Sequence, residues 1–230
     1  MPSNSSNLAI LYEDNHLIVV NKKVGDIVQG DRTGDMPLSE LVKQYIKKKY
    51  DKPGKVFLGV VHRLDRPTSG AIIFARTSKA LERLNAMLRK KEIDKTYWAL
   101  VQNKPEKLVA TLQHYLKKNP RNNKSSSFSE QVQGSKKAVL HYRVIKELNR
   151  YYLLEIDLET GRHHQIRAQL SAIGCPIKGD LKYGFNRSNK DGGIHLHARQ
   201  LRFVHPVSKE KLQITAGVPN DPLWKECTSS

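Results

Sequence analysis

The order of strand-like and helix-like patterns restricts the fold of this 230-residue chain more than any other feature of its sequence. Short apolar or alternating runs, typical of β-strands, recur along the whole chain, whereas few segments show the three- and four-residue apolar spacing of an amphipathic helix. The strand runs do not alternate regularly with helices. This order predicts an α+β fold around a mostly antiparallel sheet with flanking helices.

The individual elements follow from local signals. The turn signal Asp14-Asn15 divides the first apolar stretch into a hairpin. Helices are expected after Pro37, after an N-cap at Ser78, and before a C′ glycine at Gly174. The other strand-like runs cover residues 56–61, 71–75, 95–102, 138–148, 151–160, 195–204 and 211–216.

No linker or composition break divides the sequence, so one domain is expected over residues 7–225, after a disordered polar tail at residues 1–6. Residues 117–137 are basic, serine-rich and nearly free of aliphatic side chains. This composition predicts a mobile loop within the domain, with solvated charge favoured over contact with a partner. The protein is expected to be a monomer.

The charge of the chain predicts the class of its partner. Lysine and arginine number 40 against 22 aspartates and glutamates, which gives a net charge of +18 and favours a polyanion. Nucleic acid is preferred to a membrane surface, because the sequence has no long apolar run and no basic amphipathic helix. The N-terminus lacks a signal-peptide pattern, and Cys175 and Cys227 are expected to be free thiols, so the protein is expected in the cytoplasm.

The stretch VHRLDRPTSG places one carboxylate, Asp65, among the basic side chains His62, Arg63 and Arg66. Continuous apolar runs precede and follow this stretch, so it is predicted to be a loop between two buried strands, where rigid scaffolds present reactive groups. Two interpretations stay open. The arginines either pin the carboxylate to hold a turn together, or keep it ionised for chemistry on an anionic substrate.

A second stretch, ETGRHHQIRAQLSAIGCPIKGD, continues from the end of a strand into a helix whose buried stripe contains Ile166, Leu170 and Ile173. Arg167 lies about a quarter turn from the centre of that stripe, at roughly 100° per residue. Its stem is therefore expected to be partly buried, and a half-buried arginine needs a partner. Asp65 is the leading candidate.

Four stretches together resemble the RluA family of RNA pseudouridine synthases, in the same order and over nearly the whole chain. They are HRLDRPTSG, KTYWALV, LETGRHHQIRAQLSAIGCPIKGDLKYG and HLHARQLRFVHP. The resemblance implies an enzyme that converts uridine in structured RNA, ribosomal or transfer, to pseudouridine without a cofactor or metal. It also implies a mixed central sheet and a catalytic domain over residues 7–225. The S4 RNA-binding module of many relatives is not expected, because the synthase-like sequence starts by about Leu8.

Matched residue by residue, the family's catalytic aspartate falls on Asp65, its active-site tyrosine on Tyr97, and its carboxylate-pairing arginine on Arg167. Two routes stay open for Asp65, attack on C1′ of the ribose or removal of a proton from C2′, and both need the anion. Tyr97 offers an aromatic face for the uracil and a phenol near C5. Without the resemblance, a core tyrosine in a strand would be preferred.

The basic residues around Asp65, namely His62, Arg63 and Arg66, are predicted to contact RNA. A uridine inside a helix has to be flipped out before it can react, and Arg63 is a candidate to fill the vacated place. A surface arginine bound to the turn is equally favoured. Lys23 stands where relatives usually have proline, and this departure is expected to touch only a surface loop.

Two other functions compete. A metal-dependent nuclease would use the histidines at 163–164 and 195–197 beside Asp65, although Asp65 has no second carboxylate in its motif. A non-enzymatic RNA-binding protein would explain the charge and the aromatic pair Tyr97-Trp98. It would not explain an acidic residue in a cationic loop, where that residue opposes phosphate binding. The isomerase is therefore preferred, followed by the RNA-binding protein and then the nuclease.

Overall fold

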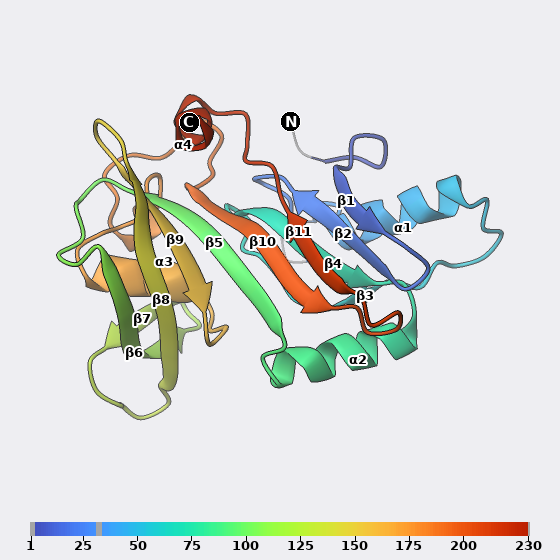
Figure 1. Ribbon diagram of the computed structural model, residues 1–230, viewed down its shortest axis with the longest axis horizontal. Coiled ribbons are helices and arrows are strands. Elements are labelled where there is room, and N and C mark those ends of the chain that lie inside the picture. The colour runs from blue at the N-terminus through green and yellow to red at the C-terminus, as the bar shows by residue number, and fades with distance from the viewer. Residues whose placement is uncertain (1–2, 31–33, 230) are drawn as a thin grey trace. The chain divides into compact units, whose positions relative to one another are not determined.

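A computed structural model describes residues 3–30 and 34–229 of the chain (Figure 1). The chain forms two compact units, and each is described by itself. The first consists of Met1–Lys95 and Ala198–Pro219, and the second of Thr96–His197 and Asn220–Ser230. One catalytic domain over residues 7–225 stays a prediction.

The first unit contains the strands β1, β2, β4, the Ala198–Val204 part of β10, and β11, which neighbour one another in that order. The strand bounds are Ile10–Glu13 for β1, Leu17–Lys22 for β2, Ser69–Ala75 for β4, Leu196–Val204 for β10 and Lys211–Thr215 for β11. A short strand, β3 (Gly59–Val60), also pairs with β4. The helices of this unit are α1 (Leu38–Lys49) and α2 (Ser78–Arg89).

Strands β2 and β4 form the centre of the first unit's core. Every residue of β4 is buried, as is the apolar first part of β2 from Leu17 to Val20. A continuous run of β-branched and aliphatic residues is typical of a strand that is covered on both faces. Helix α2 packs against β3 and β4, and it buries Ala80 and Leu84. The predicted hairpin around Asp14 and the predicted first two helices are therefore confirmed.

Two boundaries differ from those predicted for this unit. Thr77 rather than Ser78 is the N-cap of α2. Its backbone is extended, as is usual for a cap, and its side chain accepts a hydrogen bond from the Ala80 N–H at 3.1 Å. Within the predicted strand at 56–61, only Gly59–Val60 is assigned to a strand. Local signals therefore placed these elements but not their ends.

Gly70 occupies a position that only glycine can fill without strain. Its φ is +118°, and a Cβ atom there would overlap the backbone nitrogen and oxygen of Ala198. We expect Gly70→Ala to lower the free energy of unfolding by about 2 to 4 kcal/mol, measured by urea denaturation. Gly30→Ala is the control, because a Cβ at Gly30 has no neighbour within 4 Å. Equal stability of the two variants would contradict this explanation.

The second unit contains a sheet in the order β5, β9, β8, β6, β7, in which every neighbouring pair is antiparallel. The strand bounds are Ile93–Val101 for β5, Val109–Asn119 for β6, Lys124–Phe128 for β7, Lys136–Glu147 for β8 and Tyr152–Leu158 for β9. Only the Thr96–Val101 part of β5 belongs to this unit. The helices are α3 (Gln165–Ala172), the short 3₁₀ helix η1 (Leu181–Tyr183) and α4 (Pro222–Thr228). Helix α3 contacts β6 and β7. The predicted α+β class with mostly antiparallel strands is confirmed.

The loop predicted over residues 117–137 is wrong for its middle part and for both ends, because β6 extends to Asn119 and β8 begins at Lys136. Lys124–Phe128 forms β7 and pairs with the end of β6 from Tyr115 to Asn119. Ser125 is buried in this strand, and its N–H donates to the Tyr183 hydroxyl at 2.8 Å. The strand was missed because its serines carry no apolar pattern, and its pairing and burial come from residues far away in the sequence.

Two further features of the fold were not predicted from the sequence. Residues 1–2 of the predicted disordered tail lie outside the described residues, but Ser3 donates from its N–H and its hydroxyl to the Asp26 carboxylate at 2.9 and 2.7 Å. Disorder is therefore wrong for Ser3, which is held by a residue distant in sequence.

Helix α4 was not predicted from the sequence. Asp221 caps it by accepting hydrogen bonds from the Leu223 and Trp224 N–H groups.

Candidate functional site

The loop that carries Asp65 joins β3 to β4 in the first unit and contains a hydrogen-bonded turn. The Asp65 carbonyl accepts from the Thr68 N–H at 3.0 Å, and the Arg66 carbonyl accepts from the Gly25 N–H at 3.0 Å. Gly70 follows at the start of β4, with the close backbone approach described above. The predicted loop between two strands is therefore confirmed, although only β4 is fully buried and β3 has two residues.

The buried side chain of Lys22 holds this turn in place, a role that was not predicted from the sequence. Its ammonium is buried and donates to the carbonyls of Lys23, Arg66 and Thr68 at 3.0, 3.2 and 2.7 Å. Burial lowers the pKa of Lys22 to about 8, against the attraction of nearby carboxylates that include Asp65. The only sequence signal for this role was a lysine at the end of a mostly apolar strand. Lys22 therefore fixes the backbone on the C-terminal side of Asp65.

The three basic residues around Asp65 have different environments. The ring of His62 accepts a hydrogen bond at Nε2 from the Ile73 N–H at 3.1 Å, and burial, together with Lys95, lowers its pKa to about 3. His62 is therefore neutral at pH 7 rather than a near-cation. Contact between His62 and RNA stays a prediction, and a positive charge on the ring does not support it.

The two arginines of the loop are exposed. Arg66 donates from Nη2 to the Asp35 carboxylate at 2.6 Å, in a pair whose side chains are both about half exposed. A surface pair of this kind contributes little to stability. Arg63 is also exposed. Both side chains are accessible to a polyanion, and their binding to RNA stays a prediction.

Tyr97 lies on β5 in the second unit, opposite Ile156 of β9, and is 7% exposed. Its neighbour Trp98 faces the other side of the strand, where its Nε1–H donates to the Glu155 carboxylate at 3.4 Å. The predicted strand is confirmed, although burial along it does not alternate, since Thr96 and Tyr97 are both buried and so is the whole run from Ala99 to Val101.

Arg167 is buried in α3 and is held by a carboxylate that sequence reasoning did not single out. Its Nε and Nη2 donate to the two oxygens of Asp180 at 2.7 and 2.8 Å, and both side chains are almost completely buried. The guanidinium also lies over the Tyr183 ring, 4.9 Å from its centroid. The stem of Arg167 was expected to be only partly buried, but the whole side chain is buried. Pairing of Arg167 with Asp65, which belongs to the first unit, stays a prediction.

The segment before α3 has an unusual backbone. His164 is its N-cap with φ of +53°, and its Nδ1 lies 2.9 Å from the Tyr183 hydroxyl. Burial and the Arg167 charge lower the pKa of His164, which is stacked on His163 at 3.8 Å between ring centroids. Ser125 lies within hydrogen-bond distance of His163. These histidines thus pack and bond with neighbouring side chains of their own unit.

The other histidine pair suggested for a nuclease also has protein partners. His195 Nε2 lies 3.1 Å from the Asp221 carboxylate, and its ring stacks on Trp224 at 5.2 Å. His197 is tilted against the same Trp224 ring. Within residues 3–30 and 34–229, the side chains form no cluster of three or more metal-ligating His, Cys, Asp or Glu residues. Across the same residues, no helix has the length and apolar character needed to cross a bilayer.

The sequence matches a family of known proteins. The profile of the family described as RNA pseudouridylate synthase matches residues 16–172, a range that includes the Asp65 loop, Tyr97 and Arg167. The chain is 34% identical to an uncharacterized RNA pseudouridine synthase from Synechocystis sp., over 92% of the chain and 66% of that protein. It is 33% identical to tRNA pseudouridine synthase C from Vibrio cholerae, over 95% of the chain and 93% of that protein.

Another relative and two solved structures extend these similarities. Ribosomal large subunit pseudouridine synthase D from Zymomonas mobilis is 34% identical, over 93% of the chain and 70% of that protein. Human RNA pseudouridylate synthase domain containing 1 has a TM-score of 0.75 at 26% identity, covering 99% of this chain and 90% of the other. Human RNA pseudouridylate synthase domain containing 4 shares the fold, with a TM-score of 0.77 at 24% identity over 92% and 89% of the chains.

Proposed function

Because this chain belongs to the RNA pseudouridylate synthase family, we propose that it isomerises specific uridines of a structured RNA to pseudouridine. The observation that carries the proposal is the family match over residues 16–172, which spans the three matched residues Asp65, Tyr97 and Arg167. The names of its relatives include both ribosomal and transfer RNA enzymes, so both classes of RNA are candidate substrates. We place the reaction in the cytoplasm and assign it to a monomer.

The reaction rearranges bonds within one nucleotide. The N1–C1′ glycosidic bond breaks, the uracil turns, C5 bonds to C1′, and the hydrogen on C5 leaves as a proton while N1 gains one. Asp65 supplies the carboxylate, either by attacking C1′ or by removing a proton from C2′. The Lys22 ammonium attracts this carboxylate and fixes the adjacent carbonyls of Arg66 and Thr68. The loop is therefore organised before substrate binds, which reduces the cost of reorganisation during the reaction.

Arg167 and Tyr97 complete the proposed site. Arg167 stabilises the Asp65 anion with its positive charge, and the bidentate bond with Asp180 fixes the plane of the guanidinium. Tyr97 provides an aromatic face for the loosened uracil and a hydroxyl near C5 for proton removal. His62, Arg63 and Arg66 contact the RNA around the flipped nucleotide.

The loss of the C5 hydrogen gives a direct test. RNA labelled with tritium at C5 of uridine should release label to water when the protein is added, because joining C5 to C1′ expels this hydrogen. The fair substrate is total RNA from a strain that lacks the gene, since it contains the true target in its own fold. Release should continue in the presence of EDTA, and the RNA should stay intact.

The competing functions give different results in the same experiment. Tight binding of this RNA without release of tritium would support a non-enzymatic RNA-binding protein. Cleavage of the RNA that EDTA stops would support a metal-dependent nuclease. Either result contradicts the isomerase.

A further inference from the structure

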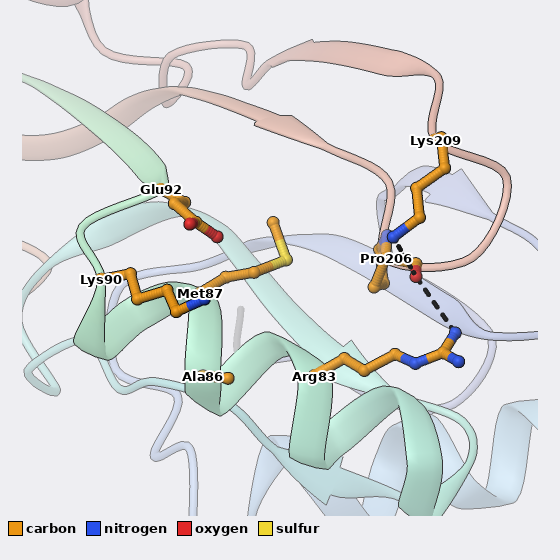
Figure 2. Close-up of a pocket in the computed structure, with 7 residues that line it drawn as sticks. All are labelled: Arg83, Ala86, Met87, Lys90, Glu92, Pro206 and Lys209. Carbon is orange, nitrogen blue, oxygen red and sulfur yellow. Dashed lines mark hydrogen bonds between the residues drawn. The ribbon is translucent and has the colours of Figure 1, made fainter.

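A groove of about 250 Å³ lies in the first unit between α2 and the turn that joins β10 to β11 (Figure 2). Nothing proposed for Asp65 uses it. Its apolar lining comes from Ala86, Met87 and Pro206, and its charged lining from Arg83, Lys90, Glu92 and Lys209. The lining thus carries three cationic side chains and one carboxylate around a small apolar floor.

The cations of the groove have donors available for an anion. Arg83 Nη1 and Lys209 Nζ both donate to the Pro206 carbonyl, at 3.1 and 3.3 Å (Figure 2). A guanidinium has five N–H donors, and this is the one hydrogen bond that the Arg83 side chain makes in the described part of the chain. Lys90 is exposed at the C-cap of α2. The groove can therefore offer several N–H donors to a ligand without breaking the fold.

Lys209 has a backbone conformation that favours glycine. Its φ is +67°, in the left-handed region that favours glycine and costs other residues roughly 1 to 2 kcal/mol. Lys91, which follows Lys90, has φ of +59°. The turn is rigid, because His205 Nδ1 accepts from the N–H groups of Val207 and Ser208 at 3.2 and 2.9 Å. Lys209 therefore keeps its charge at a position where glycine would be less strained.

The groove is remote from the reacting loop. Gly70, which follows the Asp65 turn, lies against Ala198 at the start of the first unit's part of β10. The turn begins after Val204. Val204 lies six residues along the strand from Ala198, which corresponds to about 20 Å at roughly 3.3 Å per residue. A ligand that reaches both places has to span about this distance.

We propose that this groove binds the phosphate backbone of the folded RNA substrate, at nucleotides away from the target uridine. The proposal rests on the proposed function, which makes structured RNA the substrate. The exposed Lys90 and Lys209 and the donors of Arg83 neutralise phosphates, and the floor of Ala86, Met87 and Pro206 packs against ribose. Such contacts position an RNA without reading its sequence.

The test compares two variants that lose the same charge. Lys90→Ala/Lys209→Gly removes two cations of the groove, and glycine is the residue that the Lys209 backbone favours, so the fold should keep its stability. Lys47→Ala/Lys48→Ala removes two exposed cations of α1. Affinity for bulk transfer RNA is measured by fluorescence anisotropy at several salt concentrations. Thermal unfolding of both variants checks that they are folded.

The groove variant should bind bulk transfer RNA about tenfold more weakly than the control variant at low salt. Its slope of log affinity against log salt should fall by about 1.8, since each lost phosphate contact removes roughly 0.9. The control should change the slope only slightly. Glu92→Gln should bind more tightly than wild type by about threefold, because it removes a carboxylate that repels phosphate. A gain of affinity cannot come from misfolding.

Equal slopes for the groove and control variants would overturn the proposal, as would an unchanged affinity in Glu92→Gln. Loss of binding to polyglutamate, the acidic-peptide probe, with undiminished affinity for transfer RNA would also overturn it and would assign the groove to an acidic protein. These readouts are independent of catalysis. Failure of the wild-type protein to release tritium would end the proposed isomerisation while leaving the binding comparison interpretable.

Discussion

Asp65→Asn should reduce tritium release from C5-labelled RNA by at least about a thousandfold, because the amide is nearly isosteric but can neither attack C1′ nor take a proton from C2′. Affinity for RNA and the free energy of unfolding should stay close to wild type. The loop geometry should persist, since the turn is held by backbone groups of Asp65, Arg66 and Thr68 rather than by the carboxylate alone.

The matched control is Asp94→Asn, which removes an exposed carboxylate from the same unit. This variant should release tritium at the wild-type rate. If purified Asp65→Asn kept full activity, the assignment of the catalytic carboxylate would be wrong. If it bound no RNA or unfolded at a much lower urea concentration, Asp65 would have a structural role instead.

Arg167→Met should lose both activity and about 3 to 5 kcal/mol of unfolding free energy, because it leaves the Asp180 carboxylate buried without its partner. Methionine is about as long as the aliphatic stem of arginine, so the loss of packing around that stem should be small. Urea denaturation measures the stability, and tritium release measures the activity. The effect is expected to be large because both side chains of this pair are almost completely buried.

A double-mutant cycle separates the pair from its two side chains. Asp180→Asn alone should also destabilise the protein, since it leaves a buried guanidinium without a carboxylate. The double variant Arg167→Met/Asp180→Asn should be less destabilised than the sum of the two single variants, because no buried charge is left. Its activity should stay low, since Arg167 is absent. Additive stability losses would mean that the two residues do not act as a pair.

The elements that were predicted correctly have signals within a few neighbouring residues. The strand centred on Ile72 is continuously apolar, and the helix that begins at Leu38 has an apolar stripe and a preceding proline. Strand β7 had no such signal. Its serines form a strand because β6 supplies backbone partners and Tyr183 accepts a hydrogen bond from a buried N–H. Pattern reasoning fails where a distant partner, rather than the segment itself, supplies the stabilisation.

The candidate site divides in the same way. The proposed roles of Asp65, Tyr97 and Arg167 come from the resemblance of four ordered motifs to a known family. Residue type and spacing alone did not assign them, since a core tyrosine would be preferred at Tyr97 without that resemblance. The pairing of Arg167 with Asp180 was not predicted, although both lie in one quoted stretch. A position in a sequence does not say which of several carboxylates reaches a buried guanidinium.

The α+β class, the expected polyanionic partner, the family resemblance and the candidate catalytic residues all follow from the amino-acid sequence without coordinates. Three features become visible only in the folded chain: Lys22 is a buried anchor of the Asp65 turn, His62 is neutral, and lysines accept a left-handed backbone beside a groove. The two groups of features depend on interactions of different range. Periodicity, turn preference and total charge depend on neighbours in sequence or on composition. Desolvation and hydrogen bonding depend on which groups are close in space, and Lys22 and Thr68 are 46 residues apart.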